Sequence, residues 1–98
     1  MNEQPLRVSI CEDDAAQAQF LARQVHAFAS GARVETFARA EDMLLARGEM
    51  ADILLLDIQM PGMDGVALAR ELRARGNRAQ IIFVTGFADS MQAGYDVE

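Results

Sequence analysis

The sequence predicts an α/β fold in which helices lie on both faces of a doubly wound parallel sheet. Short apolar segments alternate with amphipathic segments along the chain, in the repeating order of strand and then helix. Residues 53–56 and 81–84 are unbroken hydrophobic runs, which are typical of parallel strands buried on both faces. Only a few residues connect successive segments, so right-handed crossovers restrict the topology strongly.

The first strand and the first helix are predicted over residues 6–30. Leu6, Val8 and Ile10 occupy alternate positions, which is the period of a strand. The next segment, Ala15–Ser30, is a predicted helix whose apolar positions recur at helical spacing. These positions are Ala18, Leu21, Val25 and Phe28. We expect Asp14 to cap the start of this helix and Gly31 to end it.

The second strand and helix are predicted to be short. The strand is expected over Ala32–Phe37 and the helix over Ala38–Arg47, with Gly48 closing it. We expect the helix to turn three apolar side chains toward the core, Met43, Leu44 and Leu45.

The second half of the chain predicts two further strands and two helices. The strands are expected over Asp52–Asp57 and Gln80–Thr85, and between them a helix over Gly65–Arg75, capped by Asp64. Its apolar stripe consists of Val66, Leu68, Ala69 and Leu72. Around it lie arginines that are expected to form a solvated face: Arg70, Arg73, Arg75 and Arg78. A last helix is expected to begin at Asp89 or Ser90 and run toward Tyr95.

Composition narrows the class of protein. The chain has 98 residues, 51% of them hydrophobic, which is enough for one domain with a real core. Its formal charge of −6 disfavours direct binding to nucleic acid, which requires a basic surface. The single cysteine, Cys11, is expected to be a buried thiol in a reducing compartment. No apolar run has the length of a membrane span, so we expect a soluble cytoplasmic protein.

Acidic side chains follow two of the predicted strands. Glu12, Asp13 and Asp14 come after the first strand, and Asp57 ends the third. The carboxyl ends of parallel strands are where ligands bind in open α/β sheets, so these groups are expected to share one rim. Carboxylates so close together need a cation, and oxygen ligands suit Mg²⁺. Which two of the first three acids face the metal stays open, although Asp14 is the best candidate for the helix cap.

The same rim suggests phosphoryl transfer. Mg²⁺ neutralises charge in such reactions, and an aspartate such as Asp57 can be the nucleophile that forms an aspartyl phosphate. Thr85 follows the fourth strand and its hydroxyl can donate to a phosphoryl oxygen. The next residue, Gly86, leaves room for the incoming group and exposes its backbone N–H.

Three segments of the chain resemble the receiver domain of two-component response regulators. They are Ile10-Cys11-Glu12-Asp13-Asp14, Leu55-Leu56-Asp57-Ile58-Gln59-Met60-Pro61-Gly62-Met63-Asp64-Gly65 and Phe83-Val84-Thr85-Gly86. The residues around Ile10–Glu12 and Phe83–Glu98 are most similar to those of regulators that carry a LytTR-type DNA-binding domain. The resemblance implies a flavodoxin-like sheet of order 2-1-3-4-5 and a phosphohistidine donor on a sensor histidine kinase.

The resemblance also implies a role for each site residue. It makes Asp57 the phosphoacceptor and gives Mg²⁺ the carboxylates of Glu12 and Asp13. It assigns a metal-binding backbone carbonyl to Gln59 and the switch hydroxyl to Thr85. Any enzymatic activity would then be limited to self-phosphorylation and dephosphorylation at Asp57.

One departure from the family pattern is large. Receiver domains have a fifth strand ending in a lysine, then a cis-proline and a fifth helix, whereas residues 1–98 end before these elements and contain no lysine. We therefore expect an incomplete receiver domain with sheet order 2-1-3-4. Its fourth strand, Ile81–Val84, would be an exposed apolar edge that favours a homodimer. Phosphorylation of Asp57 would be slow or uncoupled from output.

Three alternatives compete with a phosphoaccepting receiver. The first is a protein-interaction module that binds a kinase or regulator without productive switching, which the missing lysine keeps open. A phosphatase of the haloacid dehalogenase type would need a second aspartate where the chain has Gln59. A flavin- or nucleotide-binding protein would need a glycine-rich loop after the first strand, where Glu12 and its acidic neighbours stand instead. The single histidine, His26, is expected to be a surface or boundary residue rather than a phosphorylation site.

Overall fold

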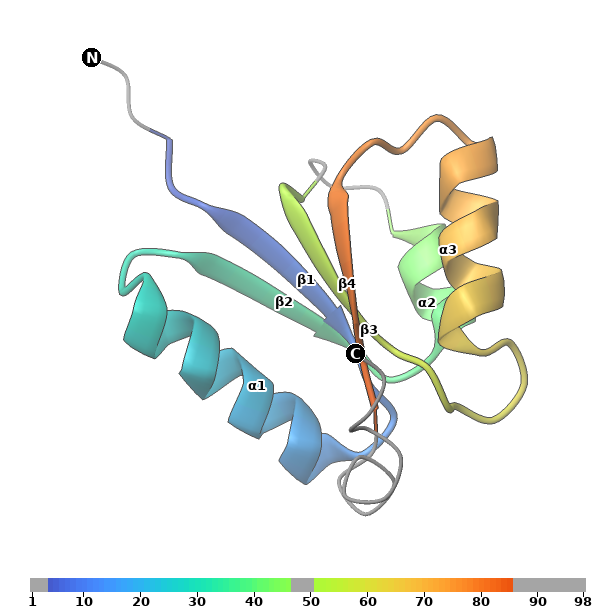
Figure 1. Cartoon of the computed structure of the whole chain (residues 1–98). Coiled ribbons are helices and arrows are strands. Elements are labelled where there is room, and N and C mark those ends of the chain that lie inside the picture. Colours follow the sequence, from blue (N-terminus) through green and yellow to red (C-terminus); the bar gives the residue numbers. More distant parts are fainter. Residues whose placement is uncertain (1–3, 47–50, 86–98) are drawn as a thin grey trace, which may run out of the picture.

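The computed structural model describes residues 4–46 and 51–85. Within these residues, strands and helices alternate: β1 (Arg7–Cys11), α1 (Ala15–Phe28), β2 (Arg33–Phe37), α2 (Ala40–Leu45), β3 (Ile53–Asp57), α3 (Gly65–Ala74) and β4 (Gln80–Val84). The four strands form one parallel sheet in the order β2-β1-β3-β4. Helix α1 covers one face of it, and α2 and α3 cover the other (Figure 1). The predicted fold class and strand order are confirmed.

The register brings the carboxyl ends of β1 and β3 together. Cys11, the last residue of β1, is paired with Phe37 of β2 and Leu56 of β3. On the far side of β3, Asp57 is paired with Val84. The residues that follow β1 and those that end β3 are therefore neighbours at one edge of the sheet.

The main hydrophobic core lies between the sheet and helices α2 and α3. Its buried side chains are Cys11, Ala40, Met43, Leu54, Leu56, Met60, Leu68, Ala69, Leu72 and Ala79. The predicted stripe of α3 supplies three of them, while Val66 of that stripe is half-buried. Burying a leucine-sized side chain stabilises the fold by about 1.5–3 kcal/mol. This core anchors β3, and with it the loop that begins at Asp57.

Both predicted helix caps are confirmed. Asp14 Oδ1 accepts hydrogen bonds from the backbone N–H groups of Ala16 at 2.9 Å and Gln17 at 3.2 Å. Asp64 Oδ1 accepts one from Ala67 N–H at 2.9 Å. Each carboxylate satisfies backbone donors that the first turn of a helix leaves unpaired, which fixes where α1 and α3 begin.

The end of α1 differs from the prediction. The helix stops at Phe28, and Gly31 does not have the positive φ of a helix-ending glycine. Two contacts close this turn in extended backbone instead. Ala32 N–H donates to Ala29 O at 2.9 Å, and the ring of His26 contacts Ala32 O at 3.0 Å. His26 is exposed, as expected, and supports this turn.

Helix α2 is shorter than predicted, and one of its apolar side chains points outward. Met43 is buried and Leu44 half-buried, but Leu45 is 75% exposed, so its predicted inward orientation is wrong. In a helix of six residues, each step turns the side chain by about 100°, and Leu45 is carried past the core. The predicted closing residue, Gly48, lies outside the described residues.

Strand β4 exposes apolar side chains on both of its faces. Ile82 is 45% exposed and Phe83 43% exposed, on opposite faces of the sheet, whereas Leu54 and Leu56 of β3 are buried. Within the described residues β4 pairs with a strand on one side only. Beside Ile82, an apolar hollow of about 340 Å³ separates β4 from α1, where Phe28 is 87% exposed. This exposure agrees with the expectation that β4 is an apolar edge among the described residues, and β3 buries Leu54 and Leu56 as its apolar run predicts.

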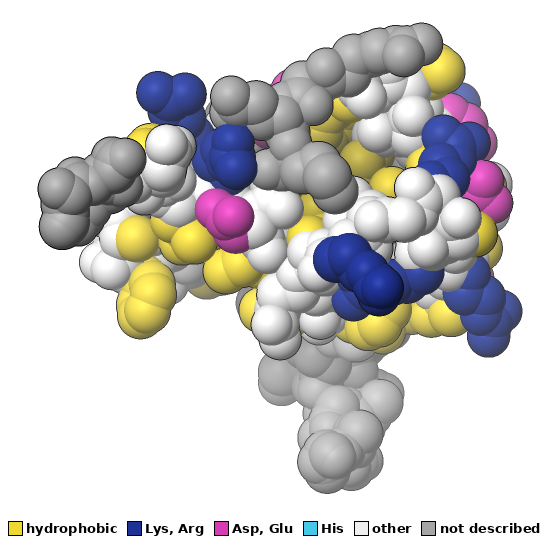
Figure 2. Space-filling view, turned by 90° about the horizontal axis from the view of Figure 1, so that it is seen from above, with side chains coloured by type: hydrophobic (Ala, Val, Ile, Leu, Met, Phe, Trp, Pro, Cys, Tyr) yellow, Lys and Arg dark blue, Asp and Glu magenta, His cyan; other side chains and the backbone are white. Residues whose placement is uncertain are grey.

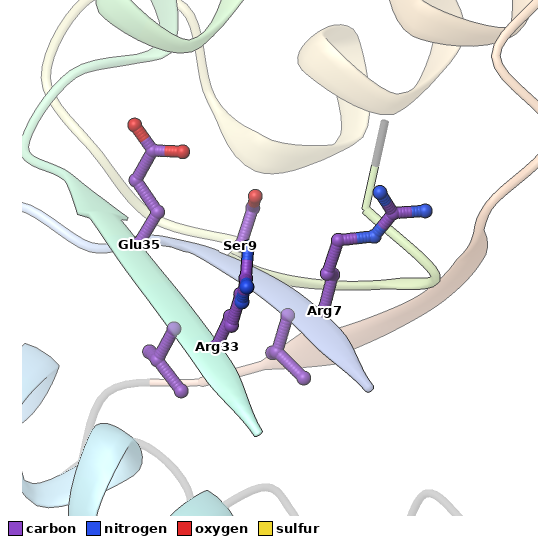
Figure 3. Close-up of a pocket in the computed structure, with 6 residues that line it drawn as sticks. Arg7, Ser9, Arg33 and Glu35 are labelled. Atoms are coloured by element: carbon purple, nitrogen blue, oxygen red, sulfur yellow. The ribbon is translucent and has the colours of Figure 1, made fainter. Parts of the chain in front are cut away.

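Two arginines stand at the first positions of β1 and β2, while the arginine side chains seen in Figure 2 are spread over several separate places. Arg7 of β1 is paired with Arg33 of β2, and both point into a hollow of about 330 Å³ with Ser9 and Glu35 (Figure 3). Arg7 also lies 4.0 Å from Asp52. This hollow is at the opposite end of the strands from the acidic residues that follow β1. Its positive charges therefore do not neutralise that acidic end.

Two of the arginines predicted to form a solvated face around α3 also make contacts within the fold. Arg73 Nη1 donates to the carbonyl oxygens of Asn77 at 3.0 Å and Ala79 at 2.8 Å, which ties the end of α3 to the start of β4. Arg75 pairs with Glu71 at 2.9 Å across one helical turn. The predicted helix that would begin at Asp89 or Ser90 lies outside the described residues.

Candidate metal centre

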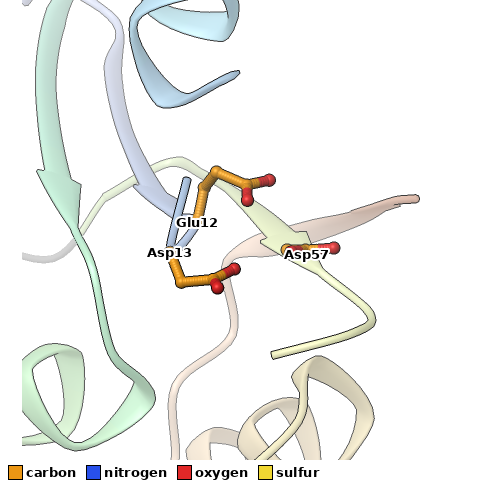
Figure 4. Close-up of side chains that lie close together, drawn as sticks. All are labelled: Glu12, Asp13 and Asp57. Carbon is orange, nitrogen blue, oxygen red and sulfur yellow. The ribbon is translucent and has the colours of Figure 1, made fainter. Parts of the chain in front are cut away.

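Three carboxylates meet where β1 and β3 end (Figure 4). Glu12 and Asp13 follow β1 directly, and Asp57 is the last residue of β3. Each offers one oxygen, and the three oxygens all lie within 4.8 Å of one another. Asp14 is not part of this cluster because its carboxylate caps α1. The structure thus favours Glu12 and Asp13 as the acidic pair beside Asp57.

Two of these carboxylates are buried. Glu12 is 5% exposed and Asp57 is 3% exposed, while Asp13 is exposed. Glu12 Oε2 accepts a hydrogen bond from Asp14 N–H at 3.1 Å, and Asp57 Oδ1 accepts one from Gln59 N–H at 3.2 Å. The other oxygen of Glu12, Oε1, is buried and has no hydrogen-bond partner among the described residues. Such an atom costs free energy unless something else satisfies it.

Burial changes the acidity of this group of side chains. Loss of solvation raises the pKa of Glu12 to about 7, and the nearby charge of Asp57 adds to the effect. Burial likewise raises the pKa of Asp57 above its ordinary value, and the charge of Asp13 acts in the same direction. The pKa of the Cys11 thiol rises to about 12, first through burial and then through Asp57 and Glu12. All three shifts show that negative charge is disfavoured at this place in the metal-free fold.

The donor set fits Mg²⁺. This ion prefers oxygen ligands from one or two carboxylates together with carbonyl groups and water. Glu12, Asp13 and Asp57 supply the carboxylates, and the unpartnered Oε1 of Glu12 is an atom that a cation would satisfy. Within the described residues, no arginine forms an ion pair with any of the three. A divalent ion is therefore the simplest group that would compensate their charge.

The loop after Asp57 folds back over the end of β3. Gly62 has a φ of 76°, which only glycine adopts without strain, and it lets the loop turn toward α3. Met60 is buried and its Sδ lies 3.7 Å from Cys11 Sγ. Gly65, the first residue of α3, packs against the backbone of Asp57. The last two features were not anticipated from the sequence, where a buried methionine and a glycine in a turn are common.

Of the remaining predicted site residues, Thr85 and Gln59 lie within the described residues and Gly86 lies outside them. Thr85 is exposed and directly follows Val84, whose carbonyl accepts a hydrogen bond from Ile58 N–H at 2.9 Å. Thr85 therefore lies at the same end of the sheet as Asp57. The backbone N–H of Gln59 contacts Asp57, whereas a metal-binding role for its carbonyl stays a prediction.

Comparison with known proteins identifies the family. Residues 8–97 match the response regulator receiver domain. The chain belongs to this family. It is similar to the response regulator protein TmoT of Ectopseudomonas mendocina, with 36% identity over 90 residues that make up 91% of this chain and 40% of TmoT. It is also similar to the DNA-binding transcriptional regulator NtrC of Salmonella typhimurium, with 32% identity over 84% of this chain and 17% of NtrC.

Solved response regulators share the fold. The response regulator StyR matches with a TM-score of 0.73 and 31% identity, covering 88% of this chain and 43% of StyR. The regulator TrrA from Thermotoga maritima, whose crystal structure is a complex with Mg²⁺ and BeF, matches with a TM-score of 0.74 and 26% identity over 90% of this chain and 76% of that one. The receiver interpretation is thus favoured over the phosphatase and flavin-binding alternatives.

The chain spans less than half of TmoT, NtrC and StyR. A LytTR-type output domain stays a prediction from sequence. No helix among the described residues has the length and apolar character needed to cross a membrane.

Proposed function

We propose that this receiver domain accepts a phosphoryl group on Asp57 from a phosphohistidine of a sensor histidine kinase, in a Mg²⁺-dependent step of two-component signal transduction. One observation carries the proposal. One oxygen from each of three carboxylates lies within 4.8 Å of the other two, and a buried oxygen of one of them, Glu12 Oε1, has no hydrogen-bond partner among the described residues. The proposal includes a cytoplasmic location, where the single thiol of Cys11 stays reduced.

Asp57 is the nucleophile in this proposal. Its carboxylate is oriented by the hydrogen bond from Gln59 N–H to Oδ1, so that one carboxylate oxygen faces the incoming phosphorus. The oxygen attacks phosphorus, the P–N bond of the phosphohistidine breaks, and its electron pair stays on the imidazole. The product is an aspartyl phosphate. Burial of Asp57 excludes water from most approaches to this acyl phosphate.

The acidic side chains would hold the metal. Glu12, Asp13 and Asp57 would bind it together with the backbone carbonyl of Gln59. When bound, Mg²⁺ neutralises charge on the carboxylates and on the phosphoryl group during transfer. Because burial raises the pKa of both Glu12 and Asp57, a bound cation would favour the ionised form of both carboxylates.

Thr85 and Gly86 would contact the phosphoryl group after transfer. The pairing of Asp57 with Val84 puts Thr85 one residue beyond the neighbour of the phosphoacceptor. A hydroxyl there can donate to a phosphoryl oxygen and so couple phosphorylation to the end of β4. Gly86 would add its backbone N–H.

Phosphoramidate, a small donor with a P–N bond, tests this function. The chain is incubated with it in Mg²⁺ or in EDTA, and the gain of one phosphoryl group is followed by mass spectrometry. We expect modification that requires Mg²⁺, vanishes in Asp57→Asn and persists in Asp42→Asn, which changes an exposed aspartate at the start of α2. Equal modification of the Asp57→Asn variant would show that another residue is the acceptor.

A protein-interaction module without productive switching is the second candidate. Such a module would bind a kinase or another regulator through the same fold, without a productive response at Asp57. Comparing this chain with one extended by a fifth strand and helix separates the two. Incorporation of phosphate only in the extended chain would favour the interaction module.

A further inference from the structure

A contact between two sulfur atoms joins the two segments that carry the acidic side chains. Cys11 Sγ lies 3.7 Å from Met60 Sδ, and both side chains are buried. Cys11 ends β1 and immediately precedes Glu12, while Met60 stands three residues after Asp57. A thiol can donate weakly to a thioether sulfur, so this contact is directional as well as apolar.

Two contacts restrain the loop after β3. On the side of the carboxylates, Gln59 N–H donates to Asp57 Oδ1 at 3.2 Å. On the side of the hydrophobic core, the side chain of the next residue, Met60, packs against Cys11. The residues on the two sides of the peptide group that joins Gln59 to Met60 are therefore both held in place. That peptide group contains the carbonyl oxygen assigned to the metal.

Methionine alone would hold this position poorly. Its side chain is unbranched, has several rotatable bonds and adapts to irregular gaps. A neighbouring donor selects one arrangement of the sulfur and so restricts the backbone next to it. Pro61 and Gly62, the next two residues of the loop, are exposed, so the next side chain packed against the core after Met60 is that of Met63.

We propose that Cys11 is a positioning residue for the metal centre. Its thiol holds Met60 and thereby aims the carbonyl of Gln59 at an ion bound by the three carboxylates. This inference rests on the proposed function and adds a determinant of metal preference to it. Mg²⁺ demands near-ideal octahedral geometry, whereas Ca²⁺ tolerates irregular sites. Loss of the sulfur contact should therefore weaken Mg²⁺ binding more than Ca²⁺ binding.

Calorimetric titration of the full chain with each ion tests the inference. Met60→Leu conserves volume and removes the sulfur, and Cys11→Ala removes the donor. We expect each variant to bind Mg²⁺ about three-fold more weakly, with less change for Ca²⁺, and we expect the double variant to lose no more than either alone. Cys11→Ser, which keeps a donor, should recover part of the Mg²⁺ affinity. Met43→Leu is the matched control, because Met43 is buried in the same core.

Three results would overturn the inference. The first is Mg²⁺ affinity in Met60→Leu equal to that of the unmodified chain. The second is equal weakening for Mg²⁺ and Ca²⁺, which a general loosening of the core would produce. The third is independent losses that add in the double variant. If the unmodified chain binds no Mg²⁺, the proposed function itself fails, and this inference fails with it.

Discussion

A side chain on Gly65 would collide with the backbone carbonyl of Asp57. The first turn of α3 therefore lies directly against the residue proposed to accept the phosphoryl group. Gly65 N–H also donates to Ile58 O at 3.1 Å, so the contact is a fixed feature of the loop. Gly65 does not have a positive φ, and the need for glycine here is steric.

Gly65→Ala should destabilise the chain by about 2 kcal/mol, because the added methyl group must push α3 away from β3. Gly31→Ala is the matched control. An added Cβ at Gly31 meets no atom within 4 Å and its φ is ordinary, so this change should be neutral or stabilise by about 0.5 kcal/mol. Urea denaturation measures both. Equal stability of the two variants would refute the close packing.

Removing one buried charge should stabilise the metal-free fold. In EDTA at pH 8, Glu12→Gln and Asp57→Asn should each raise Tm by about 5 °C, since the carboxylates repel one another and are poorly solvated. Asp52→Asn is the control with the opposite sign, because Asp52 is exposed and pairs with Arg7. A lower Tm in both site variants would mean that these carboxylates stabilise the fold without a metal.

Stability of the metal-free chain should fall as pH rises. The pKa of Glu12 is 4.5 ordinarily and about 7 in the fold, so between these values the folded chain keeps a proton that the unfolded chain has released. This contribution is full below about pH 4.5 and is lost as pH rises through 7; the raised pKa of Asp57 acts in the same direction. Thermal unfolding in EDTA at pH 5 and pH 8 measures it. Saturating Mg²⁺ should reduce the difference, and a Tm that rises with pH in EDTA would contradict the prediction.

The fold was predictable because its elements are locally encoded. Apolar runs specify the strands, and Asp14 and Asp64 mark the starts of α1 and α3. The predicted inward orientation of Leu45 is wrong because the length of α2 depends on tertiary packing, which its apolar sequence does not reveal. The predicted helix end at Gly31 is wrong because the contact of His26 with Ala32 replaces a glycine-based helix end.

The site was predictable in part. The predicted strand order puts Glu12, Asp13 and Asp57 at the same end of the sheet. The structure then shows that Asp14 caps α1 and is not one of the acids that face the metal site. The orphaned oxygen of Glu12 and the sulfur contact beneath Asp57 arise from side-chain packing between segments about 50 residues apart. No local pattern encodes such contacts.

Mutation of the two aspartates after Glu12 should affect different properties, Mg²⁺ binding for Asp13 and stability for Asp14. Asp13→Ala should abolish Mg²⁺ binding with little loss of stability in EDTA, because its carboxylate belongs to the cluster and is exposed. Asp14→Ala should cost about 1 kcal/mol of stability and keep Mg²⁺ binding, because its carboxylate caps α1. Calorimetry and urea denaturation on both variants decide between these roles. The reverse pattern would exchange the two assignments.

Exposure of β4 predicts self-association of this chain. Ile82 and Phe83 present apolar surface on both sides of a strand that pairs only with β3 within the described residues. Sedimentation should show a concentration-dependent dimer that Ile82→Thr or Phe83→Thr weakens about ten-fold or more. Leu45→Thr, which alters an exposed leucine of α2, should leave it unchanged. A monodisperse monomer at high concentration would disprove this role of β4.

The unpartnered oxygen of Glu12 also bears on how long the protein survives in a cell. If the ion binds the folded chain and not the unfolded one, intracellular free magnesium shifts the balance between the two. Proteases degrade the opened form, so turnover of the receiver would slow when magnesium is abundant and quicken when it is scarce. One buried atom would thus link the abundance of this receiver domain to the magnesium available around it.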